Sequence, residues 1–220
     1  GSGRSFQQAS RWDEQDKPLL LSVASVIDHC YVLRCMYGLV NQAIRDMICV
    51  NHGQNTWADV CRRAEVTVDQ FEGMEPYPDD LTHRLVMAAS VELGESPHDL
   101  LRAFGEFWVK YTAAQGYGPL MEMAGSSLPE FLHNLDELHA RVGVNFPQLV
   151  PPSFDTEELD EGTMHLHYHS QRQGLAPMVI GLVEGLGDRF ETSVEVEQLA
   201  CRSEGADHDV FSVRYEEQSE

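Results

Sequence analysis

The sequence predicts an α+β fold, with helices in the first two thirds of the chain and most strands in the last third. Apolar residues recur every three or four positions through about residue 142, which is the spacing of a buried helix face. Residues 164–172 instead alternate like a strand, and residues 192–200 and 209–216 have the pattern of a hairpin. Helices followed by strands are typical of α+β proteins.

The first 35 residues lack regular helical periodicity, so we expect them to lie outside the domain. They can be a tag, upstream sequence or an extra helix over residues 19–33. Residues 36–220 are expected to form one domain, because a chain of 220 residues that is 42% hydrophobic is long enough for a single core.

Three helices are expected before residue 94. The first covers residues 37–50 and buries one apolar face. The second begins at Thr56, where a hydroxyl can cap the helix and Asp59 follows three residues later. The third covers residues 80–93 and ends at Gly94, because glycine commonly follows a helix C-terminus.

The next helix is expected to begin after Ser96, because Ser96-Pro97 combines a capping hydroxyl with a proline in the first turn. Its apolar face carries Leu101, Phe104, Trp108 and Tyr111. Gly116 and Gly118 close this segment. Near the C-terminus, a helix over residues 175–190 precedes the hairpin, which turns at Gly205.

A further helix is predicted over residues 127–142, because Ser127 and Glu130 form a capping box. Its apolar face holds Leu128, Phe131, Leu132, Leu135, Leu138 and Val142 together with His139. His139 therefore points inward, whereas His133 on the opposite face is solvated. A buried imidazole needs a partner, because an unsatisfied buried polar group costs about 1–3 kcal/mol. That partner is a backbone carbonyl, which the pattern alone favours, or a metal ion.

The strand over residues 164–172 carries two different sets of polar side chains. Tyr168, Ser170 and Arg172 share one side, where they can all donate hydrogen bonds to carboxylates such as haem propionates. The same set is also compatible with a polar edge that faces solvent. His165, His167 and His169 share the other side. They are either exposed histidines or ligands of a catalytic zinc ion, which would make the protein an enzyme.

Charge and cysteine content limit the partners and the compartment. The formal net charge of −21 excludes nucleic acid and anionic membrane as main partners, because both are bound through clustered Lys and Arg. The five cysteines form no C-x-x-C pair, and their odd number favours a reducing, cytoplasmic location. The longest apolar stretch, residues 19–27, is too short to span a bilayer.

The segment Leu135-Asp136-Glu137-Leu138-His139, followed by Tyr168-His169-Ser170-Gln171-Arg172, resembles the haem nitric oxide/oxygen binding (H-NOX) domains. The likeness covers about residues 36–218, from Met36-Tyr37-Gly38-Leu39-Val40-Asn41 to the final hairpin. It looks especially like the cyanobacterial members. The resemblance implies that a helical N-terminal subdomain packs on a C-terminal subdomain with an antiparallel sheet, and that haem b is buried between them.

The resemblance also implies roles for single residues. His139 matches the iron ligand, and Tyr168, Ser170 and Arg172 match the motif that holds the haem propionates. Pro152 matches a proline that presses on and distorts the macrocycle. The wall of the gas-binding side would be lined by Trp108, Met178, Leu182 and Val40.

The ligand and the output follow from the same resemblance. Oxygen-binding members carry a hydrogen-bonding tyrosine at the place of Met178, and methionine cannot donate that bond. We therefore expect a sensor, not an enzyme, that binds nitric oxide and carbon monoxide at a five-coordinate ferrous haem and largely excludes oxygen. Because the chain ends soon after the hairpin, we expect it to signal in trans to a histidine kinase or a cyclic-nucleotide or cyclic-dinucleotide enzyme. A zinc- or haem-dependent enzyme is the alternative.

Overall fold

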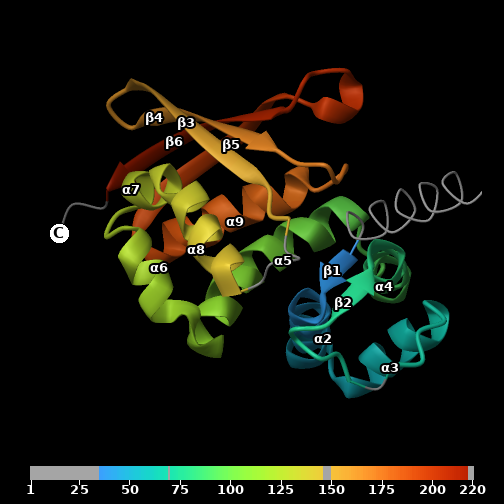
Figure 1. The fold of residues 1–220 in the computed structure, drawn as a ribbon. Helices are drawn as coiled ribbons and strands as arrows, with labels where there is room; N and C mark the ends of the chain where they lie inside the picture. The colour runs from blue at the N-terminus through green and yellow to red at the C-terminus, as the bar shows by residue number, and fades with distance from the viewer. Residues whose placement is uncertain (1–34, 69, 146–149, 218–220) are drawn as a thin grey trace, which may run out of the picture. The chain divides into compact units, whose positions relative to one another are not determined.

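The computed structural model describes residues 35–68, 70–145 and 150–217 (Figure 1), and those from Met36 onward form one compact unit. The extra helix considered over residues 19–33 lies outside the described residues. The fold is mixed helix and antiparallel sheet, which confirms the predicted α+β class. No helix among the described residues is both long and apolar enough to cross a membrane.

The N-terminal part is helical and has its own apolar core. Its elements are β1 (Cys35–Tyr37), α2 (Gly38–His52), α3 (Gln54–Arg63), β2 (Pro76–Pro78), α4 (Asp79–Leu93) and α5 (Pro97–Thr112). The short strands β1 and β2 pair with each other. Ile48 and Leu85 are fully buried in this core, to which Phe104 of α5 also contributes.

Local signals set several of the helix ends as expected. Gly94 adopts the left-handed conformation, with φ of 70°, and terminates α4. Ser96 caps α5, because its hydroxyl accepts a hydrogen bond of 3.1 Å from the backbone N–H of Asp99. The prediction for α3 was wrong by two residues. The Thr56 hydroxyl donates to the carbonyl of His52 instead of capping the helix.

After α5 the chain continues through a π-helical turn, η2 (Ala113–Tyr117), into α6 (Gly118–Ala124). Gly116 has φ of 94° and kinks the chain there, so the expected end of the segment is a bend followed by another short helix. The prediction that residues 127–142 form one continuous helix is wrong. This segment is divided into α7 (Leu128–His133) and α8 (Leu135–Asn145) at Asn134, whose side chain donates to the carbonyl of Ala124.

The C-terminal part is built on a four-stranded antiparallel sheet of order β3-β4-β6-β5. Its strands are β3 (Ser153–Asp160), β4 (Thr163–His169), β5 (Thr192–Ala200) and β6 (Asp209–Glu217). The predicted hairpin and its turn are confirmed, since Gly205 has φ of 104°. Strand β3 was not predicted, and β4 ends at His169, so Ser170 and Arg172 lie in the following loop.

Helix α9 (Ala176–Arg189) packs on one face of this sheet and also against α5 (Figure 1). Glycines let α5 and α9 approach closely. A Cβ atom on Gly105 would lie 2.2 Å from the Met178 carbonyl oxygen, and one on Gly181 would lie 1.9 Å from that of Arg102. Arg102 also forms an ion pair with Glu184 across the interface. This packing holds the C-terminal sheet to the N-terminal helices.

Candidate functional site

His139 lies on α8, facing the start of β3. Its Nδ1 is 3.3 Å from the carbonyl oxygen of Pro152, and its ring centroid is 5.7 Å from that of Phe154. Burial lowers the pKa of the imidazole, although the Pro152 carbonyl and the Asp136 charge act in the opposite direction. Nδ1 thus carries the proton that Pro152 accepts. Among the described residues, Nε2 has no hydrogen-bond partner.

The carboxylate of Asp136 fixes the orientation of α8. Its Oδ1 accepts a 2.8 Å hydrogen bond from the backbone N–H of Phe154, and its Oδ2 lies 3.4 Å from the Ser153 hydroxyl. Asp136 and His139 are three residues apart and therefore share one side of the helix. Both side chains hold α8 to the beginning of β3, so the position of the imidazole depends on this strand.

Tyr168 is 4% exposed on the inner face of β4, and its ring centroid is 5.2 Å from that of Phe154. Burial raises the pKa of its phenol, whereas a hydrogen bond with Ser170 and the charge of Arg172 lower it. The Ser170 hydroxyl in turn accepts a 3.1 Å hydrogen bond from the backbone N–H of Arg172. The three predicted side chains are therefore brought together, although two of them lie beyond the strand.

Arg172 also binds a residue that sequence reasoning missed. Its Nε donates to the carboxylate of Asp79 at 3.0 Å, and its Nη2 lies 3.5 Å from the same carboxylate. Asp79 is the first residue of α4, so this ion pair joins the N-terminal helices to the loop after β4. No local signal reveals it, because the partners are 93 residues apart.

The four residues expected on the gas-binding wall lie along α2, α5 and α9, and all are partly buried. Trp108, Met178 and Val40 pack at the margin of the N-terminal core, and Leu182 packs at the margin of the core under the sheet. The Trp108 ring lies 5.9 Å from that of Phe104 and 6.3 Å from that of Tyr111. Trp108 and Met178 thus come from the two helices that the glycine contacts hold together.

Pro152 is partly buried immediately before β3. Its carbonyl oxygen faces His139, which places the residue beside the predicted iron ligand. The pressure of its ring on a macrocycle stays a prediction.

The strand histidines do not form a site of the kind considered for zinc. In the described part of the chain, no three His, Cys, Asp or Glu side chains converge closely enough to hold an ion. The rings of His165 and His167 lie 6.4 Å apart. His167 instead faces His208, which lies just before β6 and which sequence reasoning missed.

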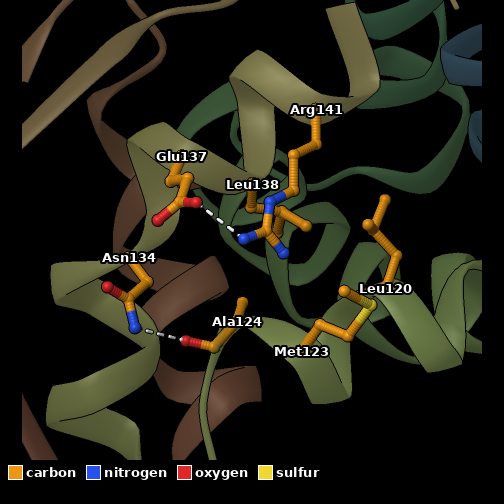
Figure 2. A pocket seen from close by; sticks show the side chains of 7 residues that line it. All are labelled: Leu120, Met123, Ala124, Asn134, Glu137, Leu138 and Arg141. Atoms are coloured by element: carbon orange, nitrogen blue, oxygen red, sulfur yellow. Dashed lines mark hydrogen bonds and ion pairs between the residues drawn. The ribbon is translucent and has the colours of Figure 1, made fainter. Parts of the chain in front are cut away.

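A small pocket lies beside α8, between this helix and α6 (Figure 2). Its volume is about 30 Å³, which is too small for an organic ligand. Figure 2 shows the Glu137–Arg141 ion pair along its margin and the Asn134 side chain reaching the Ala124 carbonyl. The ion pair lies within α8, whereas the Asn134 contact links the start of α8 to the end of α6, and the pocket is not a cofactor site.

The comparison with protein families decides what this arrangement is. The sequence model of the haem-NO-binding family, described as "Haem-NO-binding", matches residues 37–198, which is most of the chain. The chain belongs to this family. It is an H-NOX domain, the haem-based gas-sensor domain found in soluble guanylate cyclases.

Curated relatives of this H-NOX domain include longer animal proteins. The soluble guanylate cyclase gcy-31 of Caenorhabditis elegans is 31% identical over 165 residues, which are 74% of this chain and 24% of that protein. The guanylate cyclase soluble subunit beta-2 of Rattus norvegicus is 37% identical over 106 residues, 48% of this chain and 16% of the relative. The chain therefore spans about a quarter or less of the length of these relatives.

Solved H-NOX structures share the fold. A crystal structure of an H-NOX protein from S. oneidensis in the Fe(II)NO ligation state matches with a TM-score of 0.76 and 18% identity, over 82% of this chain and 99% of that chain. An NMR structure of a Shewanella oneidensis H-NOX domain in the Fe(II)CO ligation state has a TM-score of 0.74 and 18% identity, over 83% and 100%. The special likeness to cyanobacterial members stays a prediction.

The residues present fit a haem group in two respects. His139 offers a neutral imidazole with its Nδ1 proton committed to a carbonyl, which is the state in which histidine binds metals. Tyr168, Ser170 and Arg172 form one cluster of donors for carboxylates. Phe154 lies between the two groups and contacts both His139 and Tyr168.

Proposed function

We propose that this H-NOX domain holds a five-coordinate ferrous haem b through Nε2 of His139 and senses nitric oxide. The proposal rests mainly on the state of the His139 ring, whose Nδ1 faces the Pro152 carbonyl while Nε2 has no partner among the described residues. A bound haem would supply an iron atom to which a gas molecule can bind. Asp136 keeps α8 against β3 and so keeps the imidazole in place.

We assign the propionates to Tyr168, Ser170 and Arg172. The phenol and the hydroxyl are single donors, whereas a guanidinium has five N–H groups in a planar fork. Arg172 can therefore bind a propionate while its Nε still donates to Asp79. In this arrangement Asp79 acts as a positioning residue for Arg172 and connects α4 to the propionate side of the site.

The residues of the gas-binding wall favour nitric oxide and carbon monoxide over oxygen. Val40, Met178 and Leu182 have no hydrogen-bond donor, and Trp108 has a single N–H. Bound oxygen gains from a donor because it carries partial negative charge, whereas nitric oxide binds ferrous iron strongly without one. We infer that a wall of these residues leaves bound oxygen without the stabilisation that a tyrosine at Met178 would provide.

The response would begin with His139. If nitric oxide at the haem loosened the hold of the iron on His139, α8 would lose its link to the haem and stay attached to β3 through Asp136 and the Pro152 carbonyl. The break at Asn134 separates α8 from α7, which lets α8 move as a short unit. We propose that this movement is the two-state element that the domain presents to its partner.

We propose that residues 36–220 are the sensor domain and that it regulates a separate signalling enzyme in the cytoplasm. A histidine kinase or a cyclic-nucleotide or cyclic-dinucleotide enzyme is the expected partner. The curated relatives that match are guanylate cyclases, which supports a link to cyclic-nucleotide signalling.

Absorption spectra of the reduced protein under each gas test the proposal. We expect a five-coordinate ferrous spectrum that shifts with carbon monoxide and nitric oxide and does not change when oxygen is added. A stable oxygen adduct would contradict the selectivity. Absence of a Soret band after reconstitution with haem would contradict the function itself.

A further inference from the structure

Two histidines face each other on the sheet, away from the propionate cluster. Nδ1 of His167 lies 2.9 Å from Nε2 of His208. His167 belongs to β4, and its neighbours Leu166 and Tyr168 point to the buried face, so its own side chain lies on the opposite, outer face. The two side chains are 25% and 23% exposed, so solvent and small ions can reach them.

The outer nitrogen of each ring faces a carboxylate. Nε2 of His167 lies 3.8 Å from Oε2 of Glu157, and Nδ1 of His208 lies 3.5 Å from Oδ2 of Asp207. Each ring is therefore close to one negative charge. The ring of His169 stacks on that of His208 at 4.1 Å and restricts its rotation.

This arrangement is compatible with a hydrogen bond between the rings, and the neighbouring carboxylates favour a cation between them. Two neutral imidazoles carry one N–H each, so a hydrogen bond between the inner nitrogens would leave the outer nitrogen of the donor ring bare beside a carboxylate. If both outer nitrogens keep their protons, both inner nitrogens present lone pairs to each other. A proton or a metal ion must then lie between those lone pairs.

The spacing of the inner nitrogens suits a metal ion. Two nitrogens bound to one ion at about 2.0–2.1 Å are about 2.9 Å apart at a right angle and about 3.4 Å apart at a tetrahedral angle. The observed separation of 2.9 Å equals the first value, which is typical of tetragonal copper and nickel sites, and tetrahedral zinc requires the two nitrogens to separate by about 0.5 Å. Ring nitrogens that do not bind the metal usually donate to carboxylates, which is the position of Glu157 and Asp207 here.

We propose that His167 and His208 bind a divalent transition-metal ion of the zinc, nickel and copper class through Nδ1 and Nε2, respectively. Imidazole nitrogen suits these ions, and water completes the coordination because no third side chain in the described part of the chain converges on the pair. The net charge of −21 raises the local concentration of cations. This site is independent of His139 and of the proposed haem.

Zinc titration of the protein, after removal of bound metal with a chelator, tests the proposal. We expect one zinc ion per chain whose affinity falls at least tenfold in His167→Ala and in His208→Ala. His83→Ala removes an exposed histidine of α4 and serves as the matched control, with unchanged affinity. Glu157→Gln and Asp207→Asn should each weaken binding by about tenfold, because they remove the carboxylate partners.

Two further readouts make the result specific. Electron paramagnetic resonance of the Cu²⁺ complex should show two coordinated nitrogens, and one in His208→Ala. The Soret band, recorded in the same samples, should not change, so failure of haem binding and failure of this site are distinguishable. Circular dichroism verifies that each variant is folded.

Three outcomes would overturn the proposal. The first is unchanged zinc affinity in both folded histidine variants. The second is a Cu²⁺ spectrum without two nitrogen ligands in the unsubstituted protein. The third is no zinc binding at millimolar concentration, which would show that the pair shares only a proton.

Discussion

Gly181→Ala tests whether α5 and α9 pack as closely as their glycines allow. The new Cβ would lie 1.9 Å from the Arg102 carbonyl oxygen, whereas ordinary contact begins at 3.4 Å, so the helices would have to separate by about 1.5 Å. The obstructing atoms belong to the backbone and cannot rotate away. Gly105 makes a similar approach along the same interface, where its added Cβ would lie 2.2 Å from the Met178 carbonyl oxygen, so the separation would disturb this contact as well.

The expected free-energy change combines two opposing effects. Alanine is favoured over glycine inside a helix by about 1 kcal/mol, whereas overpacking costs about 1–3 kcal/mol and more when the backbone must move. We expect a net loss of about 2 kcal/mol in the free energy of unfolding. In a domain of this size that loss lowers the melting temperature by roughly 4–8 °C.

Urea unfolding and thermal melting measure the effect, with Gly143→Ala as the matched control. Gly143 is also helical, but no atom lies within 4 Å of its added Cβ, so alanine should stabilise the protein by about 0.5–1 kcal/mol there. The reasoning would be refuted if Gly181→Ala were as stable as the unsubstituted protein while the control behaved as expected.

Three other predictions concern the site and the thiols. Asp79→Asn should weaken haem retention several-fold without preventing folding, because Arg172 loses a charged partner; haem transfer to an acceptor protein measures this, and an unchanged transfer rate would contradict the positioning role. Met178→Tyr should lengthen the lifetime of bound oxygen, which stopped-flow spectroscopy detects; an unchanged lifetime would contradict the assigned wall. Burial, with a smaller contribution from Cys49, raises the pKa of the Cys61 thiol to about 11, so its alkylation rate should rise about tenfold per pH unit between pH 8 and 10. Mass spectrometry measures the alkylation rate of Cys61. An alkylation rate that levels off below pH 10 would show that this thiol is less buried than the structure has it.

Features that depend on neighbouring residues could be predicted from the sequence. Ser96 caps α5 and Gly94 terminates α4, because each effect involves atoms only a few positions away. The β5–β6 hairpin with its turn at Gly205 follows from the same kind of local signal. The inward orientation of His139 also followed from helical spacing, although the sequence predicted one helix where the structure has two.

Features that depend on distant residues could not be predicted. The break between α7 and α8 forms because the Asn134 side chain bonds to Ala124, ten residues earlier. The partners of Arg172 and His167, which are Asp79 and His208, come from other elements, so only the folded chain brings them together. Six of the eight residues of strand β3 are exposed and four are acidic, so the strand lacks the apolar alternation that marks a half-buried strand.

Substitution of His139 by glycine tests the central claim most directly. The absorption spectrum of the reduced protein is recorded for the unsubstituted chain, for His139→Gly, and for His139→Gly with added imidazole. We predict that the Soret band of the five-coordinate ferrous haem is lost or strongly altered in the variant and restored by imidazole. An unaltered Soret band and unchanged haem content in a folded His139→Gly protein would contradict the assignment of this histidine as the iron ligand.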